Sequence, residues 1–219
     1  MEELKTFLRK KDLDGSKDHI IPHTGYFYAS EALKCPRAIY YARLFPEEKP
    51  DKLLGVFFIG ETIHQLFQKI LKEARPDLVD EAEIRIKLPN GIEVSGRADL
   101  MGDTEILELK TVADIKYSLK EASLHHKGQL VLYLSQHKDK KGRVIYIDKR
   151  NLETVSHDVL FDDVIYLATI NNFANVKRAL DEGKPPAKSE MTEDWQCRYC
   201  DHRELCAKAD KSDMTLESF

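Results

Sequence analysis

Two carboxylates and a lysine lie on two neighbouring segments of alternating polar and apolar residues. Asp99 ends the first segment, and Glu108 and Lys110 belong to the second. Alternate side chains of a strand share a face, so Glu108 and Lys110 point the same way. If residues 103–104 form a two-residue turn, the two segments pair as a hairpin that brings Asp99 opposite Glu108.

Such a pair of carboxylates is the kind of site that binds a divalent cation. Two facing carboxylates repel each other, and Mg²⁺ or Mn²⁺ bound by oxygen ligands removes that repulsion. The ion could activate water for phosphodiester hydrolysis, while Lys110 could orient or deprotonate the water and stabilise developing charge. The alternative is a surface ion-pair cluster of Asp99, Glu108 and Lys110, because Glu-x-Lys on a strand is a weak motif alone.

A histidine upstream could add a third ligand to this site. His64 lies at the border of the apolar stripe of a predicted long helix, and Gly60 one turn earlier would permit another element to approach closely. An imidazole ligand would shift the preference from Mg²⁺ toward Mn²⁺. The alternative for His64 is a hydrogen-bonded residue at the edge of the core. Glu61 is a weaker candidate ligand.

Downstream, Gln129 and Tyr133 are four residues apart on a predicted helix and therefore share a face. They could hold Lys110 in place or contact a DNA backbone. The alternative is packing of Tyr133 beside a solvated glutamine. The preceding residues 125–127 (His-His-Lys) are either a phosphate-contacting patch or a solvated face.

All four cysteines fit one metal site: Cys35, Cys197, Cys200 and Cys206. The last three have the spacing C-x2-C-x5-C, and Cys35 precedes Pro36 at a predicted helix start, where a thiolate is favoured. One close pair with two single ligands is more typical of an iron–sulfur cluster than of structural zinc, which remains the alternative. Such a site would tie the two ends of the chain together, so metal loss should loosen both.

The elements that must position these residues follow from the periodicity of the apolar residues. Residues 1–27 are expected to be a polar lead-in, followed by a helical turn at residues 30–35. The pattern predicts helices at 36–45, 53–74, 121–137 and 163–181, and strands at 83–88, 92–100, 105–112, 143–150 and 153–161.

The helix at 53–74 is predicted from apolar residues that recur at helical spacing: Val56, Ile59, Ile63, Leu66, Phe67 and Ile70. We expect Glu81 and Glu83 to be structural. This order predicts an α/β (α+β) core with a mixed sheet flanked by helices.

Composition limits the class of protein. The 219 residues are 42% hydrophobic and 33% charged, which is enough for a packed core. The net charge of -4 counts mildly against nucleic acid but is compatible with it, because local patches and metal ions can attract phosphate. No apolar run could span a bilayer, and the charged N-terminus is unlike a secretory signal. We therefore expect a cytoplasmic protein with no membrane partner, in which the cysteines stay reduced and bind metal.

The motifs together resemble a known family. His64, Asp99, Glu108-Leu109-Lys110 and Gln129…Tyr133 occur in the order of the RecB-type PD-(D/E)xK nucleases. With Cys35 upstream and three cysteines downstream, the chain is most similar to the CRISPR-associated Cas-four exonucleases, from about residue 30 to residue 206. One departure is Ala98, which stands where proline usually precedes the aspartate.

The resemblance implies a fold and a function. The fold would be a restriction-endonuclease-like core at residues 53–182, with helical segment 1–52 and C-terminal segment 183–219 supplying the four cysteines for an iron–sulfur cluster, [4Fe-4S] rather than [2Fe-2S]. His64, Asp99, Glu108 and the Leu109 carbonyl would hold Mn²⁺ or Mg²⁺, Lys110 would be catalytic, and Gln129 and Tyr133 would support it.

The implied activity is metal-dependent exonuclease cleavage of single-stranded DNA from 5′ to 3′, which would trim DNA before its insertion into a CRISPR array together with the CRISPR integrase complex. The sequence leaves open whether the chain forms a homo-oligomer. The alternatives are a RecB-like nuclease of recombination repair or phage origin, and an iron–sulfur module that binds DNA without cutting it.

Overall fold

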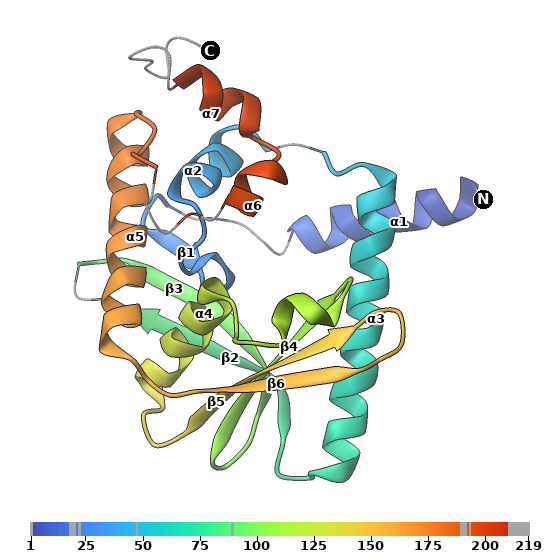
Figure 1. Cartoon of the computed structure of the whole chain (residues 1–219). Helices are drawn as coiled ribbons and strands as arrows, with labels where there is room; N and C mark the ends of the chain where they lie inside the picture. The colour runs from blue at the N-terminus through green and yellow to red at the C-terminus, as the bar shows by residue number, and fades with distance from the viewer. Residues whose placement is uncertain are drawn as a thin grey trace.

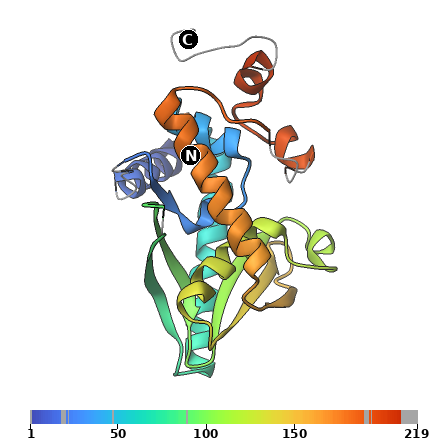
Figure 2. The same cartoon turned by 90° about the vertical axis from the view of Figure 1, so that its left-hand side faces the viewer.

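A computed structural model describes residues 2–17, 21, 23–46, 48–88, 90–188, 192 and 194–209, which form a mixed sheet covered by helices on both faces (Figures 1 and 2). The helices are α1 (Glu2–Lys17), α2 (Pro36–Leu44), α3 (Asp51–Ala74), α4 (Leu124–Gln136), α5 (Asp163–Glu182), α6 (Asp194–Arg198) and α7 (Arg203–Ala209), with 3-10 turns η1 (Ala29–Glu31) and η2 (Ile115–Ser118). The strands are β1 (Tyr26–Tyr28), β2 (Val79–Lys87), β3 (Glu93–Met101), β4 (Glu105–Val112), β5 (Lys141–Asp148) and β6 (Thr154–Val159).

The sheet has the order β1-β3-β4-β5-β6, with β2 also paired to β3. The β1–β3 and β4–β5 pairs are parallel, and β2–β3, β3–β4 and β5–β6 are antiparallel. The predicted mixed sheet is therefore confirmed. The parallel pair β4–β5 needs a crossover, which α4 supplies across one face of the sheet.

Strand β3 changes its partner part-way along its length. Its first residues pair with β1, from Tyr26↔Glu93 to Tyr28↔Ser95. Its last residues pair with β4, at Leu100↔Leu107 and Met101↔Ile106. Between these two ladders β3 is unpaired on this edge, and Asp99 lies at the end of the unpaired stretch.

Helices on opposite faces of the sheet give it two apolar cores. The larger core joins the sheet to α4 and α5 and contains buried residues such as Leu130, Leu134 and Phe173. The smaller core lies under α3, where Leu71 packs against Leu100 and Leu107. The ends of α5 follow from local chemistry, because the Asp162 side chain accepts hydrogen bonds from the first backbone N–H groups. At the other end Gly183 adopts a left-handed conformation with φ of 67°, which is common for the residue that follows a helix.

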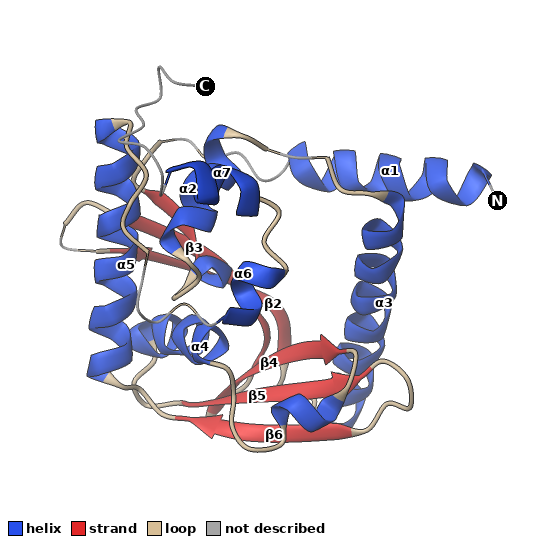
Figure 3. Cartoon of the chain, turned by 45° about the horizontal axis from the view of Figure 1, so that its top comes forward, coloured by secondary structure: helices blue, strands red, loops and turns tan. Residues whose placement is uncertain are grey.

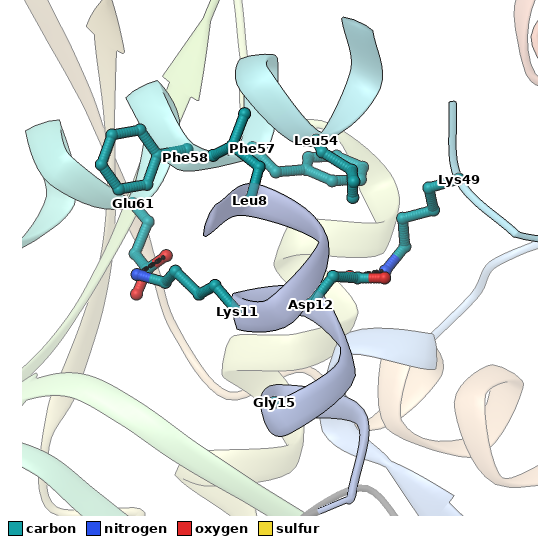
Figure 4. Close-up of a pocket in the computed structure, with 9 residues that line it drawn as sticks. All are labelled: Leu8, Lys11, Asp12, Gly15, Lys49, Leu54, Phe57, Phe58 and Glu61. Atoms are coloured by element: carbon teal, nitrogen blue, oxygen red, sulfur yellow. Dashed lines mark hydrogen bonds and ion pairs between the residues drawn. The ribbon is translucent and has the colours of Figure 1, made fainter. Parts of the chain in front are cut away.

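The expectation of a polar lead-in at residues 1–27 is wrong for α1, which packs across α3 (Figure 4). Leu8 is buried there, and Phe7 contacts Phe58 edge-to-face with ring centroids 5.8 Å apart. Ion pairs flank the contact: Lys11–Glu61 at 2.8 Å and Lys49–Asp12 at 2.6 Å. The few apolar residues of α1 stand among many charges, so the helix is recognisable only once α3 is present to cover them.

The other predicted elements occur with small shifts. Strand β4 and helices α2, α3 and α5 lie within two residues of their predicted bounds, while α4 begins three residues later than expected. In place of the helical turn predicted at residues 30–35, the structure has only the 3-10 turn η1, which begins one residue earlier. No helix in the described ranges is both long enough and apolar enough to cross a membrane.

Candidate active site

The predicted site residues lie together in one open cavity of about 740 Å³, which we call the acidic cavity. Its lining includes all six predicted side chains: His64, Asp99, Glu108, Lys110, Gln129 and Tyr133. They come from α3, β3, β4 and α4, which meet where β3 leaves β1 and joins β4. The fold therefore gathers these six side chains, but it does not bring the weaker candidate ligand Glu61 to them.

Asp99 links the helix and the two strands. The β3–β4 register pairs Leu100 with Leu107 and Met101 with Ile106, as the predicted two-residue turn at 103–104 requires, and the ladder ends one step before Asp99 and Glu108. Asp99 Oδ2 accepts a hydrogen bond of 2.7 Å from the Leu109 N–H and lies 3.1 Å from His64 Nε2. Burial lowers the pKa of His64, but the adjacent Asp99 carboxylate outweighs this effect, so that the pKa of His64 is raised.

Glu108 and Lys110 form a buried pair held by α4. Glu108 is 2% exposed, and its Oε1 accepts hydrogen bonds from Lys110 Nζ at 2.6 Å and Gln129 Nε2 at 2.7 Å. Gln129 Oε1 accepts from the same Lys110 ammonium at 3.2 Å. Burial raises the pKa of Glu108 although Lys110 opposes the shift. Burial also lowers the pKa of Lys110, but Glu108 more than compensates, and the net pKa is raised. Gln129 thus steadies Lys110, one of the two roles considered for it.

Tyr133 fixes the distance between α4 and β3. Its hydroxyl donates to the Arg97 carbonyl at 3.1 Å and accepts from Gln129 Nε2 at 3.1 Å. Gly96 makes this approach possible, because a Cβ there would lie 2.7 Å from the Tyr133 hydroxyl and 2.8 Å from the Ala29 Cβ. A side chain at position 96 would therefore push α4 or η1 away from the strand.

The acidic cavity offers the donor types of a divalent-cation site. Glu108 Oε2 is buried and has no hydrogen-bond partner, and it faces the same cavity as Asp99 and His64. An unsatisfied buried carboxylate oxygen is costly, and a bound cation would satisfy it. Within the described ranges, however, no three or more His, Cys, Asp or Glu side chains are grouped as a ready metal site. The carboxylates are held instead by the Lys110 and Gln129 side chains and by the Leu109 N–H.

Gln68, which lies beside the cavity, was missed from the sequence, and two residues that line it, Glu81 and Glu83, were expected to be structural. Gln68 is buried, and its Nε2 donates to Glu81 Oε1 at 3.0 Å and to the Asp99 carbonyl at 3.2 Å. Its position one turn after His64, on the same face of α3, was the available signal. Glu81 was expected to be structural, but it lines the acidic cavity with a left-handed backbone, φ 52°. Such a conformation is strained for a non-glycine residue and often marks a functional position.

The remaining candidates from the sequence, Glu61 and residues 125–127, lie outside the acidic cavity. Glu61 pairs with Lys11 on the side of α3 that α1 covers, so it is not placed as a ligand (Figure 4). His126 is part-buried, and its Nδ1 lies 2.8 Å from both Ser123 Oγ and the Tyr146 hydroxyl. Burial lowers the pKa of His125 to about 4, so this histidine is neutral near pH 7. The segment 125–127 is therefore not simply a solvated face.

All four cysteines line a second cavity of about 540 Å³, which we call the cysteine cavity. Cys35 precedes α2, Cys197 lies in α6, Cys200 in the following turn and Cys206 in α7; Figure 3 shows these helices beside one another. Burial raises the pKa of Cys200, and the nearby Cys35 and Cys206 thiols add to the shift. All four are free cysteines. Four sulfur donors suit iron–sulfur or zinc, but the absence of a ready metal group among the described residues leaves the cluster a prediction.

A mixed sheet that carries an aspartate and a Glu-x-Lys on adjacent strands, beside a helix histidine, defines the class of metal-dependent nucleases with a restriction-endonuclease-like core. A family model described as the PD-(D/E)XK nuclease superfamily matches residues 61–207, so the chain belongs to this superfamily and is a nuclease.

Similarity to individual proteins agrees with this assignment. The chain is 24% identical to the CRISPR-associated exonuclease Cas4 of Saccharolobus solfataricus, over 91% of this chain and 96% of that protein. The predicted resemblance to the Cas4 exonucleases is thereby confirmed. The crystal structure of SSO0001 superposes with a TM-score of 0.70 at 22% identity, covering 92% of this chain and 95% of that one. A phage-related exonuclease from Haemophilus somnus 129PT has a TM-score of 0.50 at 13% identity, over 67% of this chain and 79% of that one, which indicates the shared fold alone.

Proposed function

We propose that this nuclease is a metal-dependent exonuclease that cuts single-stranded DNA from 5′ to 3′. The observation that carries the proposal is the convergence of Asp99, Glu108, Lys110 and His64 in one open cavity of a PD-(D/E)XK fold. A bound Mn²⁺ or Mg²⁺ would supply Lewis-acid activation of water and phosphate. His64, Asp99, Glu108 and the Leu109 carbonyl would hold this ion.

The chain's own residues account for the remaining roles. Gln129 holds the Lys110 ammonium at the cavity, where the lysine can orient a water molecule and offset negative charge on a phosphate. The Leu109 N–H holds the Asp99 carboxylate in a fixed direction. These contacts keep the polar groups in position before substrate binds, which is how electrostatic stabilisation becomes effective.

The cavity wall supports a preference for single strands. Tyr26 and Tyr28 line it with ring centroids 5.6 Å apart, and Arg85 and Arg97 line it from β2 and β3. Aromatic side chains stack on unpaired bases, and arginines contact the phosphates between them. Paired bases are already stacked on one another, so a duplex would not use this surface.

An end-labelled cleavage assay tests the activity. Single-stranded and duplex DNA, labelled at either end, are incubated with the protein and Mn²⁺ and then with the Asp99→Ala variant. We expect stepwise shortening of the single strand from its 5′ end and no cutting by the variant. Equal activity of the parent and the variant would defeat the site assignment, and internal cuts alone would defeat the exonuclease assignment.

We further propose that the cysteine cavity holds an iron–sulfur cluster, [4Fe-4S] rather than [2Fe-2S], in a cytoplasmic protein whose thiols stay reduced. Support comes from the four cysteines that share one cavity and from the single C-x2-C pair among them. The visible absorption spectrum and metal content of anaerobically purified protein test this. We expect iron in the protein and a broad absorption band in the visible range. A colourless protein that contains zinc would show that the cysteines form a structural zinc site and not an iron–sulfur cluster.

For its biological role, we propose that the nuclease trims DNA before insertion into a CRISPR array, together with the CRISPR integrase complex. The support is the similarity to the Cas4 exonuclease across nearly the whole of both chains. Co-purification with the integrase encoded in the same genome, and trimming of overhangs in its presence, are the expected results. If neither occurs, a role in repair or phage biology takes precedence.

A further inference from the structure

Helix α3 carries a second apolar face that the rest of the described chain does not cover. Val56 is 42% exposed, Ile59 52%, Leu66 45% and Ile70 49%, with Ile63 partly buried between them. These residues belong to the apolar stripe predicted for this helix, but they face solvent and not the core. The sheet side of α3 is formed by other residues, such as Gly60, Gln68 and Leu71. Helix α1 covers yet another side, at Leu54, Phe57 and Phe58 (Figure 4).

The spacing of this exposed stripe is that of a coiled-coil seam. Its members alternate in steps of three and four residues: Val56, Ile59, Ile63, Leu66 and Ile70. This is a strict repeat of 3.5 residues, narrower than the stripe with which a surface helix packs onto a core. A seam of this kind fits the matching seam of a second helix through interdigitated side chains. The chemistry of the face therefore selects a helical partner.

The stripe is also symmetric about its centre. Continuing the same steps outward reaches Lys52 at one end and Glu73 at the other, and both are exposed. If two copies of α3 pair in opposite directions about Ile63, Val56 lies across from Ile70, and Ile59 across from Leu66. Lys52 of each copy then lies across from Glu73 of the other. Pairing in the same direction would instead place like charges together at both ends.

We propose that this face binds a second copy of the chain, with the two α3 helices antiparallel about a twofold axis near Ile63. An interface of this symmetry uses the same patch on both copies, as the self-complementary stripe requires. The apolar part from Val56 to Ile70 extends over about 20 Å of helix at 1.5 Å per residue. One helix pair of that length is at the low end of specific interfaces, so we expect a dimer that dissociates at micromolar concentrations.

Sedimentation of the full chain over a series of protein concentrations tests the proposal. The wild-type protein is expected to pass from monomer to dimer as concentration rises. Ile59→Lys and Leu66→Glu should each weaken the dimer at least tenfold, because each buries a charge in the seam. Both positions are about half exposed in the monomer, so the unfolding midpoint of each variant should stay close to that of wild type.

Mixing the two variants distinguishes the direction of pairing. In the antiparallel dimer the ammonium introduced at position 59 of one chain faces the carboxylate introduced at position 66 of the other, and the remaining Ile59–Leu66 contact is intact. The mixture should therefore dimerise better than either variant alone. Parallel helices would show no such rescue, which would overturn the antiparallel arrangement. A wild-type protein that stays monomeric at the highest concentration, or variants that dimerise like wild type, would overturn the proposal.

Discussion

The acidic cavity and the cysteine cavity are assembled in different ways. The carboxylates of the acidic cavity lie on two strands joined by a short turn, and protein groups already hold them: Leu109 N–H holds Asp99, while Lys110 and Gln129 hold Glu108. The cysteines come from opposite ends of the chain, and the Arg37 guanidinium donates a hydrogen bond to Cys206 Sγ at 3.5 Å. The first site is therefore preorganised by the fold, whereas the second would itself help to hold the fold together.

This difference predicts that mutations in the acidic cavity change mainly the cleavage activity, whereas mutations in the cysteine cavity change mainly the stability. Substitutions of the charged residues of the acidic cavity should remove activity and leave stability nearly unchanged. Substitutions of the cysteines should remove stability first, because a bound metal would connect the N-terminal helices to α6 and α7. Each variant below is therefore measured for both cleavage rate and thermal unfolding.

The largest effect is expected for Cys200→Ser in the metal-loaded protein. A cross-link between residues 35 and 197–206 would restrict the unfolded chain by about 5 kcal/mol in the loop-entropy description. For a chain of this size such a loss corresponds to a fall in the unfolding midpoint of roughly 10–20 °C. The matched control is Tyr199→Phe, at the neighbouring residue, which is 81% exposed. Equal midpoints for the two variants would show that the cysteine cavity does not join the ends.

The next largest effect is expected for Glu108→Gln, which should lose activity and keep its stability. This change removes the charge needed to bind a divalent ion but keeps the shape of the side chain. Because burial raises the pKa of Glu108, its charge is costly in the folded state, and the neutral amide should cost little stability. We expect cleavage with Mn²⁺ to fall at least ~100-fold, the scale of single charge-stabilising groups, with a midpoint close to wild type. Retained cleavage would remove Glu108 from the site.

The sequence could predict the acidic cavity because its geometry is local. A two-residue turn sets the register of β3 and β4, and the strand period sets which side chains share a face, so Asp99 and Glu108 were expected opposite each other. The left-handed backbone of Glu81 lies outside such rules. It interrupts the β2–β3 pairing between Asp80 and Ala82, at the point where Gln68 reaches Glu81 from α3.

Long-range packing explains the other misses. Periodicity identified α3 as a helix but could not say which of its apolar sides the sheet would cover. Ile59 and Leu66 therefore looked like core residues and are exposed. The helix α1 was missed for a related reason. Its apolar face is short, and Leu8 is buried only because it packs against α3. A pattern along one segment reports the segment's own conformation, whereas burial depends on distant segments.

A smaller loss of activity should follow Gln129→Ala. The amide holds both Glu108 and Lys110, so its removal takes one hydrogen bond from each of them without changing either charged group. Residues that orient such groups typically contribute about 10- to 100-fold. Gln136→Ala, at the far end of α4, is the matched control, because Gln136 donates to Ser135 at the surface. If both variants cleave DNA at the wild-type rate, Lys110 does not depend on Gln129 for its position.

The smallest effect is expected for Tyr133→Phe, which tests how far preorganisation extends from the carboxylates. The change removes the hydroxyl that donates to the Arg97 carbonyl and accepts from Gln129, and it leaves those two groups short of a partner. The free energy of unfolding should fall by about 1 kcal/mol, the usual net value of one such hydrogen bond, and cleavage by a few-fold at most. Denaturant unfolding beside Tyr117→Phe, whose side chain is 82% exposed, supplies the comparison. A Tyr133 variant as stable as that control would mean that Gly96 and the apolar contacts of α4, rather than this hydroxyl, set the spacing between helix and strand.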